Sequence, residues 1–242
     1  MAAQFNLHGA RAAALFAEIS RSPNLISLWP TNEKSGTIID RVLANRYNSA
    51  SVGGNPAYSK AIGTHFWALD FDGTGDYVDF GSPANIAFER TSSFSALALV
   101  DPNVSAIGTF LSKFDLNTPR GWEWAITAAR LPFVNIQNGA GNQLQSTSNA
   151  ALTNGADVMI GFTYDGSSGT AGLILYKNGV VDASTNNANT LSATILAPDY
   201  TAQLGAASTG QMINGDIGFV ALWNHVVTPE EFRRYAFLAG FL

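Results

Sequence analysis

Residues 69–81 read LDFDGTGDYVDFG, two short alternating segments joined by a glycine-rich turn. Leu69 and Phe71 alternate with aspartates, and Val78 and Phe80 flank another aspartate. A period of two places the apolar side chains on one face of a strand and the polar ones on the other. Glycine and aspartate tolerate the backbone conformations of a tight turn. The stretch therefore predicts a two-stranded antiparallel unit with its apolar face, which includes Trp67, in a core.

Four carboxylates lie in this stretch, at Asp70, Asp72, Asp76 and Asp79. The favoured interpretation places them on the solvated face and in the turn of the hairpin. A calcium loop is one alternative, but an EF-hand needs a glutamate where Gly81 stands, and helices on both sides. A second alternative is glycosidase chemistry by Asp70 and Asp72, since the carboxyl groups of a retaining enzyme lie about 5 Å apart.

Period-two alternation recurs along most of the chain, and many short strands of this kind are typical of two packed sheets. The Asn178-Gly179 step favours a type I′ hairpin turn. Residues 138–153 and 182–194 are polar without a clear period and are interpreted as surface loops or weak edge strands. The predicted strands are Leu25–Trp29, His65–Phe71, Tyr77–Phe80, Phe94–Val100, Gly108–Phe114, Trp122–Ala128, Phe133–Ile136, Val158–Tyr164, Gly172–Lys177, Val180–Ala183, Gln203–Gly205 and Asp216–Trp223.

One helix is predicted at each end of the chain. Residues 6–20 carry an apolar stripe at helical spacing, formed by Ala12, Leu15, Phe16 and Ile19. Near the other end, Thr228 and Pro229 supply an N-cap and a first-turn proline for a short helix over residues 230–237. We predict residues 1–22 to be a helical extension and residues 23–242 to be one sandwich domain.

Composition excludes several classes of function. The 242 residues carry a formal charge of −5 with no run of basic residues, which argues against nucleic acid and anionic membranes as partners. The absence of cysteine excludes disulfides and a thiolate nucleophile. No apolar run is long enough to cross a bilayer. The first residues lack the pattern of a secretory signal, so the protein is expected to stay where it is made.

Three stretches resemble, in order and spacing, the laminin G-like domains of the concanavalin A-like jelly-roll superfamily. They are residues 69–81, residues 157–184 (DVMIGFTYDGSSGTAGLILYKNGVVDAS) and residues 213–236 (INGDIGFVALWNHVVTPEEFRRYA). The SLWPTNEKSGTIID stretch, residues 27–40, is similar to the first strand and turn of that family. The resemblance implies an all-β sandwich of two antiparallel sheets that binds carbohydrate or protein and, in some relatives only, hydrolyses glycosides.

The resemblance also bears on the site. Hydrolytic relatives use an E-x-D-x-x-E-like strand, whereas Glu123 stands alone here. Motifs of serine hydrolases, P-loop proteins and zinc proteases are absent as well, so we expect no enzyme. Trp122 and Trp124 share one strand face and are the candidate ligand-binding residues, because such a pair can stack on sugar rings.

Many relatives bind calcium through an early aspartate and one in the last strand. Asp40 fits the first role, but Gly218 occupies the second position, and Asp216 lies two residues away. Losing one hard oxygen ligand weakens a calcium site. We therefore expect no metal and no cofactor, with Asp40 and Asp216 as weak candidates.

The apolar ends need a cover, either their own sandwich or a neighbour. Domains with such an Ala-rich helix and no secretion signal look like virion proteins of tailed bacteriophages. We expect a homo-oligomer that contacts other virion proteins through Leu15, Phe16, Ile19, Phe237, Leu238, Phe241 and Leu242.

Three functions follow from these observations. The first is a non-enzymatic structural or decoration protein located in a phage virion, with a lectin-like sandwich that can adhere to surface glycans. The second is a free carbohydrate-binding lectin. The third is a glycoside hydrolase or lyase of the same fold, which would need a pair of catalytic acids.

Overall fold

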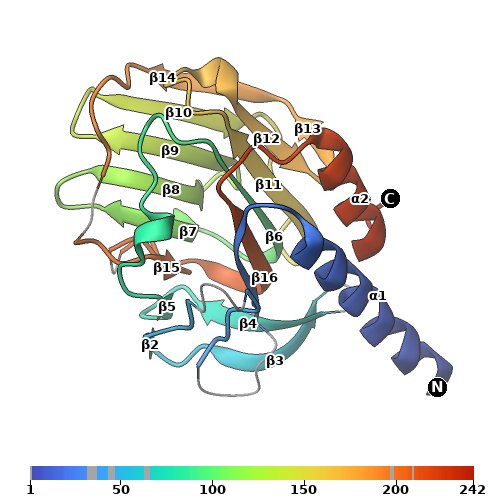
Figure 1. Ribbon diagram of the computed structural model, residues 1–242. Coiled ribbons are helices and arrows are strands. Elements are labelled where there is room, and N and C mark those ends of the chain that lie inside the picture. Colours follow the sequence, from blue (N-terminus) through green and yellow to red (C-terminus); the bar gives the residue numbers. More distant parts are fainter. Residues whose placement is uncertain (1, 32–36, 43–46, 63–65, 197–198, 209) are drawn as a thin grey trace.

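The computed structural model describes residues 2–31, 37–42, 47–62, 66–196, 199–208 and 210–242. Two antiparallel sheets pack face to face, and two helices lie together on the side of one sheet that faces away from the other (Figure 1). This arrangement confirms the predicted all-β jelly-roll sandwich with a helix near each end. None of the described helices is long and apolar enough to span a bilayer.

Sheet A follows the order β13-β12-β11-β6-β16-β4-β3. Strand β1 also pairs with β16, beyond the stretch of β16 that pairs with β4. The bounds in this sheet are β1 Leu25–Pro30, β3 Ala57–Ile62, β4 Phe66–Asp72, β6 Phe94–Pro102, β11 Val158–Tyr164, β12 Leu173–Lys177, β13 Val180–Asp182 and β16 Asn214–Trp223.

Sheet B follows the order β14-β10-β9-β8-β7-β15-β5-β2. Two short 3₁₀ helices, η1 Ala84–Ile86 and η2 Thr170–Gly172, lie in the connections. The bounds in this sheet are β2 Ser51–Gly53, β5 Tyr77–Asp79, β7 Gly108–Asp115, β8 Arg120–Ile126, β9 Pro132–Asn138, β10 Gln143–Ser148, β14 Ser184–Asn189 and β15 Gln203–Leu204.

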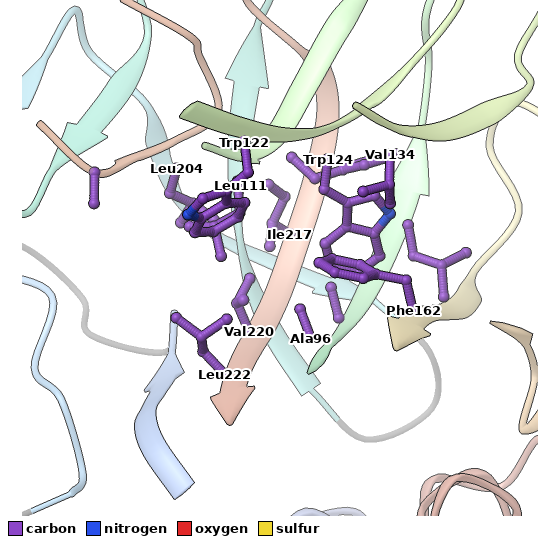
Figure 2. Close-up of a cluster of buried hydrophobic side chains, with 14 of the residues drawn as sticks. Ala96, Leu111, Trp122, Trp124, Val134, Phe162, Leu204, Ile217, Val220 and Leu222 are labelled. Atoms are coloured by element: carbon purple, nitrogen blue, oxygen red, sulfur yellow. The ribbon is translucent and has the colours of Figure 1, made fainter. Parts of the chain in front are cut away.

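The main core fills the space between the two sheets. Large side chains from alternate positions of both sheets meet there, because a period of two sends every second residue inward. Trp124 of β8 lies 5.3 Å from Phe162 of β11, centroid to centroid, across this layer (Figure 2). Trp122 belongs to the same core, and its indole N–H donates to the carbonyl of Ile86 in η1 at 3.1 Å.

A second apolar cluster lies between the outer face of sheet A and the two helices. Helix α1, Ala2–Arg21, buries Leu15 and Ile19 completely against this face. Helix α2, Pro229–Ala239, lies beside it, and Arg234 of α2 pairs with Glu18 of α1 at 2.9 Å. The carboxy-terminal half of α1 is thus packed against its own chain.

Helix α2 begins as the sequence predicts. The hydroxyl of Thr228 accepts from the N–H of Glu231, whose carboxylate accepts in turn from the N–H of Thr228. This capping box satisfies two of the N–H groups that lack partners within the first turn. The helix ends at Gly240, which adopts a left-handed conformation at φ 89°.

The predicted strands are observed with shifts of a few residues, and His65, at the predicted start of β4, lies outside the described residues. Strands β2 and β3 were not predicted. Strands β10 and β14 lie in the segments interpreted as loops or weak edges, and β14 is indeed the edge of sheet B. Trp67 was predicted in the core, but its side chain is 54% exposed.

The carboxylates of the opening stretch close turns. Asp72 accepts from the N–H of Thr74 at 2.6 Å, and Asp79 accepts from that of Gly81 at 2.6 Å. Asp76 is buried, which corrects the expectation of a solvated side chain, and it accepts from the N–H groups of Asn55 and Asp72. Asp72 and Asp76 therefore organise the β4–β5 turn, and Asp79 organises the turn after β5.

Candidate functional site

A row of polar side chains crosses the outer face of sheet B, the face turned away from the core. It occupies directly paired positions on seven neighbouring strands. Each member alternates with core residues such as Val78, Leu111, Trp122, Val134 and Leu144, so each points outward. The row consists of Ser51, Asp79, Gln203, Ser112, Glu123, Asn135 and Gln145.

The middle of this row, on β7, is covered by the chain itself. The hydroxyl of Ser112 donates to the carbonyl of Ala206 at 2.9 Å, and both residues are fully buried. The N–H of Thr109 donates to the carbonyl of Gln211 at 2.8 Å. Residues 206–208 and 210–211 are thus fastened to β7. Accessible positions lie on both sides of this cover, at the exposed Ser51 on β2 and at the half-buried glutamines of β9 and β10.

Four primary amides gather on β9 and β10, on one side of this cover. Register pairs Asn135 with Gln145 and Gln137 with Gln143 across β9 and β10. Asn135 is buried, whereas the three glutamines are half-buried. We call Asn135, Gln137, Gln143 and Gln145 the amide platform. Within the described part of the chain, the side chains of Gln143 and Gln145 form no hydrogen bond, so their donors and acceptors face solvent.

A directed chain of hydrogen bonds supports the platform. The amide nitrogen Nδ2 of Asn135 donates to Oε1 of Glu123 and to Oε1 of Gln137, both at 3.0 Å. Nε2 of Gln137 then donates to the carbonyl of Gly139 at 3.2 Å. Because a carboxylate only accepts, Glu123 fixes which way the amide of Asn135 points.

Glu123 and Asn135 also leave two acceptors unsatisfied. Both residues are more than nine-tenths buried, and neither Oε2 of Glu123 nor Oδ1 of Asn135 has a partner in the described residues. Burial raises the pKa of Glu123, and the bond from Asn135 offsets only part of this effect. A buried donor beside either oxygen would therefore stabilise the folded state.

Replacing Glu123 by glutamine supplies such a donor without changing the shape of the side chain. We expect the variant Glu123→Gln to raise the free energy of unfolding by about 1–2 kcal/mol at neutral pH. Since the folded-state pKa lies above the ordinary value of 4.5, the contribution of Glu123 is complete below that pH and is lost as the pH rises through the raised pKa. Urea unfolding from pH 4 to 8 should show the gap between variant and wild type widening with pH.

Glu89 provides the matched control. Burial alone would raise the pKa of Glu89, but bonds from the hydroxyl of Thr194 and the N–H groups of Arg90 and Ile195 outweigh it and lower the pKa. The variant Glu89→Gln should therefore lose stability at neutral pH, where the carboxylate is ionised. Equal effects of the two substitutions would contradict the interpretation of Glu123.

A small pocket lies at the opposite edge of sheet B, around β2. Its volume is about 340 Å³, and its polar lining comes from Thr37, Ser49, Ser51 and Asn55. Gly53 of β2 permits a close approach, because a side chain there would collide with the ring of Tyr77. The lining residues that the structure describes offer hydroxyl and amide groups but no charged side chain.

The predicted aromatic ligand site is corrected by the structure. Trp122 and Trp124 do share a strand face, but that face is the core, and each side chain is only 1% exposed (Figure 2). Neither ring can stack on a sugar in this arrangement. The sequence pattern of alternating tryptophans fits a core face and a surface face equally well.

The two weak metal candidates do not share a site. Both oxygens of Asp40 accept backbone N–H groups, those of Leu28, Val42 and Tyr47. Asp216 is roughly 16 Å further along β16, since Leu28 pairs with Ala221, five residues away. Asp216 instead pairs with Asp70 and Asp101 on the neighbouring strands. Among the described residues, no three His, Asp or Glu side chains are arranged to hold a metal ion.

The predicted assembly residues divide into two groups. Leu15 and Ile19 are fully buried under their own chain, and Phe16, Leu238 and Phe241 pack partly against the same cluster, which corrects the expectation for α1. Phe237 and Leu242 are 64% and 52% exposed. A homo-oligomer and a virion partner stay predictions for these two residues.

Comparison with known proteins identifies the family. Residues 72–233 match the laminin G-like model of the concanavalin A-like lectin/glucanases superfamily. The match covers about two thirds of the chain, and the chain therefore belongs to this superfamily. No curated protein sequence matches the chain.

Solved structures share the fold at low sequence identity. The binding domain of Paraclostridial Mosquitocidal Protein 1 is 11% identical over 90% of this chain, with a TM-score of 0.66. The binding domain of botulinum neurotoxin serotype D/C is 14% identical over 92%, also at 0.66. A Trypanosoma rangeli sialidase is 12% identical over 94%, at 0.61. The chain spans 52%, 53% and 38% of these structures, respectively.

Proposed function

We propose that this protein is a carbohydrate-binding module whose amide platform binds the hydroxyl groups of a glycan. The observation that carries the proposal is the pair of solvent-facing glutamines, Gln143 and Gln145, beside the fixed amides of Asn135 and Gln137. An amide offers a donor and an acceptor side by side, which complements sugar hydroxyls that can do both. Membership in a lectin-containing superfamily supports the same class.

The proposal includes no hydrolysis. Glycosidases need two carboxyl groups about 5–9.5 Å apart. The polar row contains two, Glu123 and Asp79, but three strand spacings separate them, or roughly 14 Å. The neighbour of Glu123 on β9 is the amide of Asn135 rather than a second acid. Binding without turnover therefore fits this face best.

Alanine substitutions on the platform test the proposal. The variants Gln143→Ala and Gln145→Ala should each weaken binding to a glycan selected on an array by about fivefold to tenfold, since a hydrogen bond contributes about 1 kcal/mol. Isothermal titration calorimetry measures the effect. Asn117→Ala, an exposed amide in the loop after β7, is the matched control and should bind like the wild type. Equal affinity of all three variants would exclude the platform as the binding site.

A further inference from the structure

The chemistry of the platform floor restricts which glycans it can accept. Glu123 and Asn135 present two buried acceptors without donors, Oε2 and Oδ1. Both N–H groups of the Asn135 amide are already used, by Glu123 and by Gln137. Both oxygens are shielded from solvent, so a ligand does not reach them, but their negative charge density next to Gln143 and Gln145 disfavours an anionic group.

The surrounding strands add no positive charge. In the described strands, the outward-facing positions of β8, β9, β10 and β14 contain no lysine or arginine. An acidic group of a bound glycan would instead lie close to the carboxyl group of Glu123. A carboxylate or sulfate on a ligand would lose its hydration here without gaining a cationic partner.

We propose that the amide platform selects uncharged glycans and discriminates against sialylated, uronic or sulfated ones. This inference rests on the proposed function and specifies the class of ligand. It sets the chain apart from structural neighbours such as the botulinum neurotoxin DC binding domain, solved in complex with SialylT, and the sialidase, solved with difluorosialic acid. A hydroxyl group can donate to and accept from the amides of Gln143 and Gln145, whereas an acidic group can only accept and brings a negative charge close to Glu123.

An array printed with matched pairs tests the inference. Each pair contains a neutral glycan and its acidic counterpart, such as lactose beside sialyllactose and an unsulfated beside a sulfated galactan. We expect the wild-type protein to bind neutral members at least tenfold more tightly than their counterparts. Equal or tighter binding of the acidic members would overturn the inference and leave the proposed function intact. Binding to no glycan would refute the proposed function, and the inference with it.

Introducing a positive charge on the platform provides a gain-of-function experiment. Gln145 is half-buried at the surface, so the variant Gln145→Arg can be accommodated without disturbing the core. It should raise the affinity for the acidic counterparts about tenfold, because an arginine pairs bidentately with carboxylate and sulfate groups. Thr147→Arg, two residues along the same outward face, is the second variant, in case the first fails to fold. Folded variants with unchanged preference would count against charge as the basis of selection.

Discussion

The variant Asp40→Ala is expected to lower the free energy of unfolding by about 3 kcal/mol, because each donor left without a partner at a buried site costs about 1–3 kcal/mol. The carboxylate accepts the N–H groups of Leu28 at 3.0 Å, Val42 at 2.9 Å and Tyr47 at 3.1 Å. It thereby ties the segment after β1 back to that strand. Urea unfolding followed by circular dichroism measures the loss.

Asparagine at the same position separates hydrogen bonding from charge. Asp40→Asn retains an oxygen for Leu28 and Val42, but its amide nitrogen faces the N–H of Tyr47. Burial raises the pKa of Asp40 despite its hydrogen bonds, so removing the charge recovers some desolvation energy. We expect a cost of about 1 kcal/mol.

The exposed Asp72 is the control for this series. Among the described residues, the carboxylate of Asp72 accepts one hydrogen bond, from the N–H of Thr74. The variant Asp72→Ala should therefore cost about 0.5 kcal/mol. A loss at Asp72 as large as that at Asp40 would contradict the anchoring role. Calcium-dependent stability that disappears in Asp40→Ala would instead favour the metal interpretation that the geometry argues against.

The opening stretch shows what a period of two can and cannot predict. It correctly placed Leu69, Phe71 and Val78 in the core between the sheets. The period of two did not predict that the opposite face of β4 is also covered. On that face, Phe66 and Ala68 pack in the cluster beneath α1. Periodicity assigns residues to faces, but the cover of each face depends on elements distant in the sequence.

The prediction that Trp67 is buried is wrong for a related reason. Trp67 shares a face with Leu69 and Phe71, but β4 pairs with β16 only from Leu69 onward, because β1 occupies the next part of β16. The tryptophan therefore projects beyond the packed layer. Strand ends are positions where alternation alone gives no information about burial.

The amide platform depends on register in the same way. Asn135 with Gln137 and Gln143 with Gln145 each show a period of two, which is visible in the sequence. The four side chains form one platform only because β9 pairs with β10. The sequence of β10 resembles a polar loop, because its inward positions include Ser146 and Ser148 rather than large apolar residues. Those hydroxyls bond to Ser184 and to the carboxylate of Asp182.

Removing the indole of Trp124 should give the other large loss of stability, about 3–5 kcal/mol for Trp124→Ala. The side chain is 1% exposed and packs against Phe110 at 5.6 Å and Phe162 at 5.3 Å between ring centroids, so truncation leaves a cavity that its neighbours cannot fill. Thermal and urea unfolding measure this loss, and Trp67→Ala, at a 54% exposed position, should cost under about 1 kcal/mol.

A substitution of Trp124 can distinguish a role in the core from a role in ligand binding. The milder variant Trp124→Phe keeps an aromatic ring in the core and should remain folded, with reduced stability. If the ring serves packing alone, the folded fraction of this variant binds glycans with wild-type affinity, whereas Gln145→Ala loses affinity without losing stability. A folded Trp124→Phe protein with weakened glycan binding would contradict a role for this ring in packing alone, because the platform lies on the opposite face of sheet B, on β9 and β10.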